Sequence, residues 1–345
     1  MLMRSPRAVT HAAREHRGGP DPDPSRPRPR RRYRILLRGA EVELGGRTLL
    51  MGVLNVTPDS FFDGGSFAEA EAAVARGLAL FEAGADVLDV GGESTRPGGA
   101  SRVDAAEECR RVVPVVRGLR ARGAGPLSVD TTKAAVARAA LDAGADLVND
   151  VSGFRFDPAM APLVAERGVP AVVMHLRGDF GSMHREPAYR DVMEEVALEL
   201  EEALGRGEDA GVPRERILVD PGLGFAKDAS HSLEVLRRLG ELASLDRPVL
   251  VGPSRKSFIG AALGGRPPGE RLLGTAAAVA AAVMAGAHVV RVHDVAEMLQ
   301  VVRVCDAILS AGGGTGGRGP FNAEDAEGAE TAEGEGNTET AEKGR

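Results

Sequence analysis

The sequence lacks several features that mark particular classes of protein. It contains no tryptophan and only two tyrosines in 345 residues, so it offers little for a base-stacking platform that binds single-stranded nucleic acid. Its formal net charge of −7 argues against general nucleic-acid binding. No apolar run reaches the roughly 18 residues of a membrane span, and the longest candidate, 275–286, is alanine-rich and too short. What remains is an ordinary globular composition.

Cysteine is also scarce. Cys109 and Cys305 each fall in a predicted helix, far from any spacing typical of metal ligands. We therefore expect two free thiols in a reducing compartment, which favours a cytoplasmic location and disfavours a structural zinc site.

Both ends of the chain differ in composition from the middle. Residues 1–33 are rich in arginine and proline and lack the apolar core of a secretory signal. We favour a disordered basic extension there, with a transit peptide or an anion-contacting arm as alternatives. Residues 311–345 are acidic and nearly free of apolar side chains, which predicts a disordered tail. The folded domain is expected at about 34–310.

Within that domain, short apolar segments alternate with helix-length segments. Residues 34–49 predict a small hairpin that plugs one end of the domain. Eight strands, each followed by a helix, predict a (β/α)8 TIM barrel of the α/β class. A doubly wound open sheet is the alternative, disfavoured by the strand count and by the lack of a Gly-x-Gly-x-x-Gly turn after the first strand. The predicted strands are 50–56, 87–91, 127–130, 147–151, 171–175, 217–220, 249–251 and 289–293.

A weak internal repeat supports the barrel. Residues 83–89, 143–149 and 285–291 each read Ala-Gly-Ala, then a polar residue, two apolar residues and a second polar residue. The pattern predicts a helix that ends at glycine and leads at once into a strand. The final polar residues, Asp89, Asn149 and Arg291, should lie in buried strands, where an unpaired polar group costs about 1–3 kcal/mol. They must therefore have partners, either one another or a ligand.

Barrel enzymes place their active sites at the carboxyl ends of the strands, and polar residues follow every predicted strand here. Carboxylates and amides suit the edge of a flat, nitrogen-rich heterocycle, and cations suit a phosphate or pyrophosphate. The pattern indicates transfer or elimination at that leaving group, with Asn55 and Asp63 as candidates for holding Mg²⁺. The candidate heterocycle contacts are Asp130, Asn149, Asp220 and Lys256, and the candidate polyanion contacts are Asn55, Arg96, Ser257, Arg291 and His293.

Each candidate also has a purely structural interpretation. Asp220 precedes Pro-Gly and is a good turn former, and His293 is compatible with a hydrogen-bonded core histidine. His175 fits either role. Asp89 is expected to orient its neighbours rather than to bind ligand. Glu93 is compatible with a structural ion pair to a cation.

Seven short segments of the sequence, most of them at the predicted strand ends, together resemble the dihydropteroate synthase family. The resemblance runs from about residue 34 to residue 306, and the motifs stand in the family's order. The matching segments are MGVLNVTPDSFFDGG (51–65), DVGGESTRPG (89–98), SVDT (128–131), NDVS (149–152), DPG (220–222), SRKS (254–257) and RVHD (291–294).

The resemblance implies a barrel transferase of folate biosynthesis, of the kind that sulfonamides target. Such an enzyme joins p-aminobenzoate to 7,8-dihydropterin-6-ylmethyl diphosphate and releases pyrophosphate. It further implies Mg²⁺ as cofactor, with Asn55 near the metal and Asp63 as a loop carboxylate that helps to assemble the closed site. The implied pterin contacts are Asp130, Asn149, Asp220 and Lys256, and the implied pyrophosphate contacts are Asn55, Arg96, Arg291 and His293. The implied p-aminobenzoate contacts are Thr95, Arg96, Pro97 and Ser257. The implied catalytic residues are Asn55, Asp63, Lys256, Arg291 and His293.

Phe62, Leu223, Ala226, Pro253 and the stretch after His175 depart from the family pattern. None is an assigned contact, so these departures bear on loop shape and sulfonamide sensitivity rather than on the reaction. Two alternatives stay open: a pterin-binding methyltransferase of the corrinoid-dependent kind, and a non-catalytic relative that binds pterin or a partner.

The segment 275–286 predicts a helix that is apolar on nearly all sides, which places it in the core or at an interface. Because the resembling family pairs through its last helices, we expect a homodimer.

Overall fold

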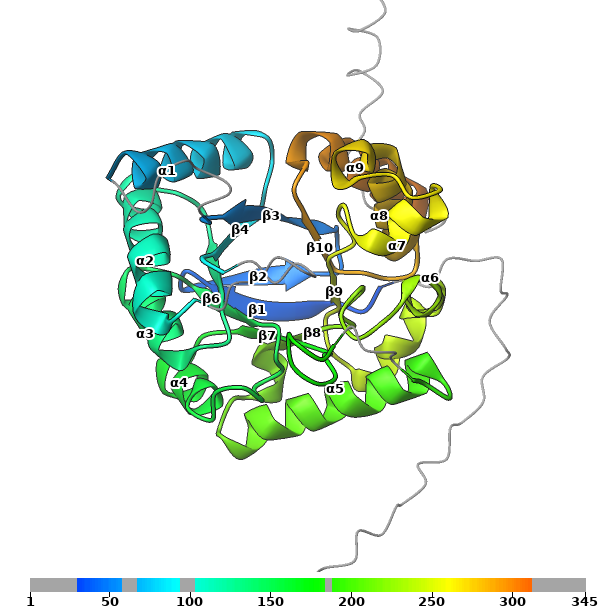
Figure 1. Cartoon of the computed structure of the whole chain (residues 1–345), viewed down its shortest axis with the longest axis horizontal. Helices are drawn as coiled ribbons and strands as arrows, with labels where there is room; N and C mark the ends of the chain where they lie inside the picture. The colour runs from blue at the N-terminus through cyan, green and yellow to red at the C-terminus, as the bar shows by residue number, and fades with distance from the viewer. Residues whose placement is uncertain (1–29, 58–66, 94–102, 184–187, 312–345) are drawn as a thin grey trace, which may run out of the picture.

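Eight parallel strands form a nearly closed barrel inside a ring of helices, with a two-stranded hairpin across one end (Figure 1). The computed structural model describes residues 30–57, 67–93, 103–183 and 188–311. The hairpin strands are β1 (Tyr33–Leu37) and β2 (Ala40–Leu44). The barrel strands are β3 (Leu49–Asn55), β4 (Val87–Gly91), β5 (Leu127–Asp130), β6 (Leu147–Asp150), β7 (Ala171–Met174), β8 (Ile217–Asp220), β9 (Leu250–Val251) and β10 (Val289–Val292).

The helices follow the strands in alternation, as the sequence predicts. They are α1 (Phe67–Glu82), α2 (Ala105–Ala121), α3 (Ala134–Asp142), α4 (Met160–Arg167), α5 (Val192–Asp209), α6 (Ala229–Arg237), α7 (Ser257–Ala262), α8 (Leu272–Met284) and α9 (Val295–Ser310). Short 3₁₀ helices span Arg214–Arg216, Leu239–Leu245 and Pro268–Glu270.

The strand order confirms the barrel. Neighbouring strands run β8-β7-β6-β5-β4-β3-β10-β9, and a parallel bridge between Val219 and Val249 joins the two outer strands. Helices cover the outside of the barrel, so most strand residues are buried on both faces and the strands read as apolar runs.

The three repeat glycines end helices as predicted. Gly84, Gly144 and Gly286 have φ angles of 104°, 111° and 101°, in the region that favours glycine. The residue after each glycine donates its amide to the carbonyl five positions earlier, at 2.9–3.0 Å. This pattern closes α1, α3 and α8 and directs the chain into β4, β6 and β10.

The N-terminal hairpin closes the base of the barrel. Ile35, Leu37 and Leu44 are buried and share a hydrophobic cluster with residues from the amino-terminal halves of the barrel strands. The hairpin turn itself lies at Arg38 and Gly39, both of which have positive φ. The barrel residues of this cluster are Leu49, Met51, Val87, Leu147, Val172, Leu218, Leu250 and Val289.

The part of the chain that packs on the barrel begins before the expected residue 34. The buried guanidinium of Arg30 donates to Thr48 Oγ1 at 2.6 Å and to Ala287 O at 3.1 Å, and forms an ion pair with Asp306. The rest of the predicted basic extension, and the predicted acidic tail after residue 311, lie outside the described residues.

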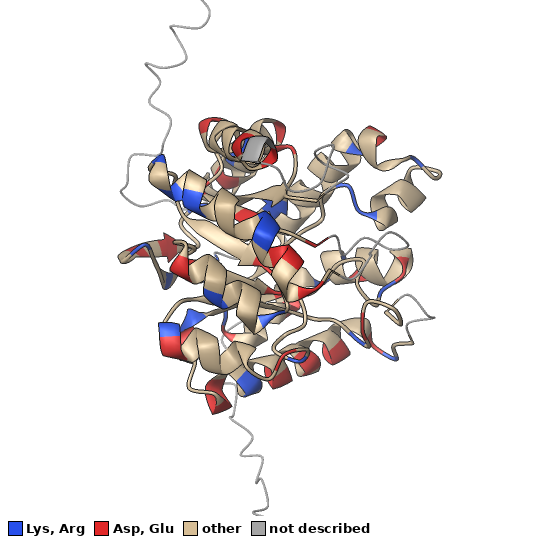
Figure 2. Ribbon diagram, turned by 60° about the vertical axis from the view of Figure 1, so that its left-hand side comes forward, with Lys and Arg blue, Asp and Glu red and all other residues tan. Residues whose placement is uncertain are grey.

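Lysine, arginine, aspartate and glutamate residues lie mainly on the helices and loops around the barrel (Figure 2). Cys109 in α2 and Cys305 in α9 are both free, as expected. Within the described ranges, no helix is long and apolar enough to cross a membrane.

Shortening a buried side chain of the hairpin should destabilise the whole domain. We expect Leu44→Ala to lower the free energy of unfolding by about 2–5 kcal/mol, because Leu44 is 0 % exposed inside the basal cluster. Leu36→Ala, on the same hairpin but 39 % exposed, should change it by no more than about 0.5 kcal/mol. Urea denaturation followed by circular dichroism measures both, and equal midpoints for the two variants would show that the hairpin does not close the core.

Candidate active site

The predicted polar residues lie at one rim of the barrel. Asn55, Asp130 and Asp220 are the last residues of β3, β5 and β8. Asn55 pairs with Gly91, Gly91 with Asp130, and Asp130 with Asn149, so these positions lie in register across four neighbouring strands. The strands therefore bring together residues that are far apart in the sequence.

A buried carboxylate lies at the centre of this rim. Asp89 Oδ2 accepts a hydrogen bond from Asn149 Nδ2 at 2.9 Å and one from Arg291 Nε at 2.6 Å. The three polar residues of the internal repeat are thus partners of one another, as their burial required. Asp89 orients its neighbours, in line with its expected role. Its second oxygen is buried without a partner among the described residues.

Arg291 extends the same network to β5. Its Nη2 donates to Asp130 Oδ2 at 2.8 Å. Burial raises the pKa of Asp130 to about 7, although the positive charge of Arg291 opposes that shift. Burial thus disfavours the charged form of the Asp130 carboxyl, and hydrogen-bond donors from a substrate would favour it.

Asp220 begins a tight loop at the end of β8. Its Oδ1 accepts from the amide of Gly222 at 2.7 Å, so the turn-forming role is real. Gly222 has a φ of +66°, and a Cβ there would lie 2.2 Å from the carbonyl oxygen of His175. Burial raises the pKa of Asp220. The carboxylate both shapes the loop and remains at the rim.

Lys256 approaches the same loop from the other side. It immediately precedes α7, and its Nζ donates to Leu223 O. The ammonium also lies 4.6 Å from the centroid of the Phe225 ring. Burial lowers the pKa of Lys256 to about 8. Ser257, the first residue of α7, is exposed beside it.

His293 lies just after β10 and is oriented by a serine that the sequence analysis left without a role. The hydroxyl of the buried Ser254 lies 3.0 Å from His293 Nδ1 and accepts from the His293 amide at 3.2 Å. Arg255, from the same Ser-Arg-Lys-Ser segment, pairs with Asp294, with Nε 2.9 Å from Oδ2. Only part of that segment therefore remains for a ligand.

Four predicted site residues, Asp63, Thr95, Arg96 and Pro97, lie outside the described residues. Glu93 is described and pairs with Lys133, as its structural interpretation expected. Sequence reasoning missed Lys227, which lies seven positions after Asp220 and contacts His175. Its only sequence signal was a lone lysine after the apolar stretch that follows Pro221.

Known proteins resemble this chain closely. The profile of the pterin binding enzyme family matches residues 51–293. A dihydropteroate synthase of Mycobacterium leprae is 49 % identical over 269 residues, which cover 76 % of this chain and 94 % of that protein.

Two solved structures of Xanthomonas albilineans dihydropteroate synthase also resemble this chain in fold and sequence. One, with 4-aminobenzoic acid, is 46 % identical with a TM-score of 0.75, and the match covers 81 % of this chain and 98 % of that one. The other, with 7,8-dihydropteroate, is 43 % identical with a TM-score of 0.71, and the match covers 80 % and 98 %. By profile, sequence and fold, the chain belongs to the dihydropteroate synthase family, transferases of folate biosynthesis.

Proposed function

We propose that this rim joins p-aminobenzoate to 7,8-dihydropterin-6-ylmethyl diphosphate, giving 7,8-dihydropteroate and pyrophosphate. The observation that carries the proposal is the Asp89 network, which places an amide, a carboxylate and a guanidinium side by side at the ends of β5, β6 and β10. The relatives crystallised with 4-aminobenzoic acid and with 7,8-dihydropteroate support the same substrate and product.

The pterin would lie against Asp130, Asn149, Asp220 and Lys256. A carboxylate accepts two N–H bonds from an amino-pyrimidine edge, and an asparagine amide both donates and accepts. Asp130 and Asp220 are the two carboxylates, and burial raises the pKa of both. Donors on the heterocycle would replace water at these oxygens and stabilise their charge.

The diphosphate would lie against Arg291, His293 and Asn55, with Arg96 as a further contact from outside the described residues. In the reaction, the C–O bond between the pterin methylene and the diphosphate breaks, and its electron pair leaves with the diphosphate. The heterocycle spreads the positive charge on the methylene. The lone pair of the aniline nitrogen then forms the C–N bond, and that nitrogen loses a proton afterwards.

This chemistry asks for positioning and charge stabilisation rather than for a strong base. An aniline nitrogen needs no deprotonation before it attacks. The described rim fits that need, because its cations are Arg291 and Lys256. Ser257 beside Lys256 is the described candidate for the p-aminobenzoate side, and Thr95, Arg96 and Pro97 are its proposed partners in the segment after β4.

Asn55 is the residue proposed to contact Mg²⁺. Among the described residues, no group of three or more His, Cys, Asp or Glu side chains is arranged to hold a metal. Mg²⁺ at phosphate-transfer sites typically takes few protein ligands and completes its shell with substrate oxygens and water. One amide oxygen at the end of β3 fits that pattern. When bound, the ion would neutralise charge on the leaving diphosphate.

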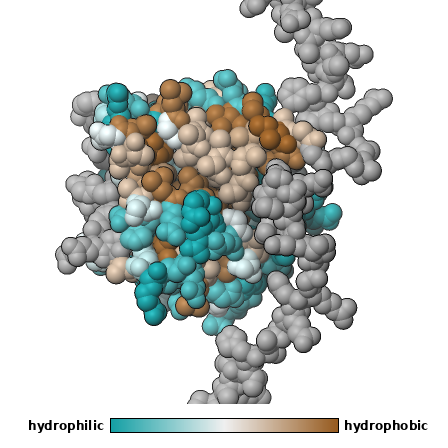
Figure 3. Space-filling model, turned by 90° about the vertical axis from the view of Figure 1, so that its right-hand side faces the viewer, coloured by the Kyte–Doolittle hydropathy of each residue, from teal (hydrophilic) through white to brown (hydrophobic). Residues whose placement is uncertain are grey.

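We also propose that the chain forms a homodimer through α8 and α9. The buried face of α8 packs on the barrel, but its opposite face is apolar too, and the helix contains no charged residue. Figure 3 shows apolar side chains gathered on the side of the molecule that these helices occupy. The exposed residues of this face are Leu273, Ala277, Ala281 and Met284 in α8, and Val304 and Ile308 in α9.

Pyrophosphate release tests the reaction directly. We expect release from the dihydropterin diphosphate to require both p-aminobenzoate and Mg²⁺, with dihydropteroate formed in equal amount, and chelation to abolish it. Asn55→Ala should raise the Mg²⁺ concentration for half-maximal rate, whereas Asn149→Ala should raise the KM for the pterin and leave the Mg²⁺ dependence unchanged. Pterin binding without release would instead favour a silent relative or a methyltransferase.

The pH profile should report on Lys256. Because burial lowers the pKa of Lys256 to about 8, its cation is present below that pH and is lost above it. We therefore expect kcat/KM for the dihydropterin diphosphate to fall above about pH 8. Lys256→Arg should abolish this alkaline fall at the cost of a lower overall rate, since a guanidinium stays charged. An unchanged alkaline limb in the variant would assign the titration to another group.

Light scattering after size exclusion tests the dimer. We expect the mass of two chains at micromolar concentration, and a single-chain mass for Leu273→Glu combined with Val304→Glu. Leu198→Glu is the matched control, because Leu198 is 61 % exposed on α5, away from α8 and α9. A wild-type peak with the mass of one chain would refute the proposal.

A further inference from the structure

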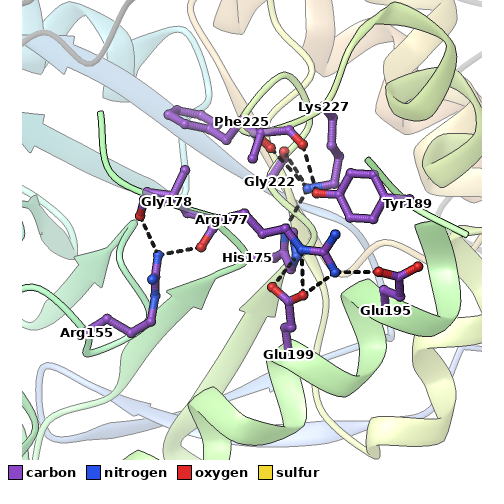
Figure 4. Close-up of polar contacts among 12 residues, drawn as sticks. Arg155, His175, Arg177, Gly178, Tyr189, Glu195, Glu199, Gly222, Phe225 and Lys227 are labelled. Carbon is purple, nitrogen blue, oxygen red and sulfur yellow. Dashed lines mark hydrogen bonds and ion pairs between the residues drawn. The ribbon is translucent and has the colours of Figure 1, made fainter. Parts of the chain in front are cut away.

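A buried lysine lies behind the Asp220 loop and has no assigned role. Lys227 is 5 % exposed, and its Nζ lies 2.7 Å from His175 Nδ1. The same nitrogen lies 3.2 Å from the carbonyl oxygens of Gly222 and Phe225. Figure 4 shows Lys227 between these two loop carbonyls and the histidine ring. It makes no described contact with Asp130, Asn149 or Arg291.

The contacts continue from His175 to an acidic side chain of α5. His175 Nε2 lies 3.1 Å from Glu199 Oε2. This contact does not meet hydrogen-bond geometry, and Nε2 is buried with no hydrogen-bond partner among the described residues, so Glu199 acts on the ring through its charge. Glu199 Oε1 in turn lies 2.6 Å from Arg177 Nε, and Arg177 Nη2 lies 2.6 Å from Glu195 Oε2.

Counting hydrogens indicates that this pair carries one extra proton. The contacts to Gly222 O and Phe225 O need one hydrogen each, since carbonyls only accept, and Nε2 needs a hydrogen so that its lone pair does not face the Glu199 carboxylate at 3.1 Å. The contact between Nζ and Nδ1 needs a fourth. A neutral lysine amine supplies two hydrogens and a neutral imidazole supplies one. Four contacts are therefore satisfied only when Lys227 and His175 together hold one positive charge.

Side chains supply most of the hydrogen bonds to the carbonyls of this loop, and Gly222 O also accepts from the Phe225 amide at 3.1 Å. Gly222 O and Phe225 O face Lys227, Leu223 O accepts from Lys256, and Ala226 O accepts from Tyr189 Oη at 2.8 Å. Ala226 also has a φ of +48°, which alanine rarely adopts. The side chain of Lys227 at the end of the loop, together with Lys256 and Tyr189 from outside it, therefore fixes its shape.

We propose that Lys227 and His175 share one proton, retained by the negative charge of Glu199, and that this buried cation holds loop 220–227 in the shape that presents Asp220 to the pterin. Lys227, His175 and Glu199 are positioning residues, since none of them touches the reacting atoms. The inference rests on the proposed pterin-binding role of Asp220.

Two negative charges favour the cation: Asp220 acts most on Lys227, and Glu199, which contacts His175, acts on both members of the pair. Burial lowers the pKa of His175 to about 4 and lowers that of Lys227 as well. Burial also disfavours the charged form of Glu199, but His175 and Arg177 keep its pKa at about 2, so its charge is constant at neutral pH. The ionisable groups that face the pair are Arg177, Tyr189, Glu199, Asp220 and Lys256, with Glu195 behind Arg177 and His231 behind Tyr189.

The test is the pH dependence of Glu199→Gln relative to wild type. Removing the carboxylate charge should lower the pKa of the pair into the assay range. We expect the variant's kcat/KM for the dihydropterin diphosphate to approach the wild-type value near about pH 6. Relative to wild type, it should then fall by roughly tenfold per pH unit above the new pKa, with the loss expressed in KM. Dividing the variant's kcat/KM by the wild-type value at each pH cancels the alkaline fall that both proteins share through Lys256.

Glu195→Gln is the matched control. Glu195 lies one turn before Glu199 on α5 and pairs with the same Arg177, but it does not contact His175. The ratio of kcat/KM of the Glu195→Gln variant to that of wild type should not vary with pH. In a second arm, Lys227→Met should give a high pterin KM at every pH, and Glu199→Gln added to Lys227→Met should cause no further loss.

A constant ratio for Glu199→Gln across the pH range would overturn the inference, because it would show a merely structural role. An equal pH-dependent loss in Glu195→Gln would overturn it too. Absence of turnover in the wild-type enzyme would instead count against the proposed function.

Discussion

The Asp89 carboxylate is the interaction on which the rest of the rim depends. A buried charge is costly unless it is paired and hydrogen-bonded. Asp89, in β4, meets that condition by binding Asn149 from β6 and Arg291 from β10. Arg291 also binds Asp130 in β5. One buried carboxylate thus fixes three residues of the proposed site, and loss of Arg291 would leave the Asp89 charge buried without a cationic partner in this network.

Asp220 lies on the opposite side of the rim, and a different set of contacts holds it in place. Its loop is held from one side by Lys256 and from behind by Lys227, through main-chain carbonyls rather than through the carboxylate. The two halves of the proposed pterin site therefore rest on different chemistry. A side-chain ion network fixes Asp130 and Asn149. Hydrogen bonds from Lys227 and Lys256 to loop carbonyls, with the bond from the Gly222 amide to the carboxylate, fix Asp220.

Much of this arrangement followed from the sequence because its signals are local. Repeated Ala-Gly-Ala segments located three helix ends and the buried polar residues Asp89, Asn149 and Arg291, whose mutual contacts burial required. The pair of Lys227 and His175 gave no such signal, since 52 positions separate the two residues and only the packing of β7 against β8 brings them together. Arg30 was assigned to the extension because composition cannot reveal a single arginine that bonds Thr48 and Asp306.

The ion pair between Arg291 and Asp130 links the two ends of the proposed substrate. Arg291 uses Nε for Asp89 and Nη2 for Asp130, so within the described residues its remaining N–H groups are the ones left for a diphosphate oxygen. Donors from a pterin would stabilise the charged form of Asp130, whose pKa burial raises to about 7. A charged Asp130 holds Arg291 more firmly in place. In the proposed reaction, occupation of the heterocycle side would thereby order the cation proposed to receive the leaving group, before the aniline nitrogen attacks.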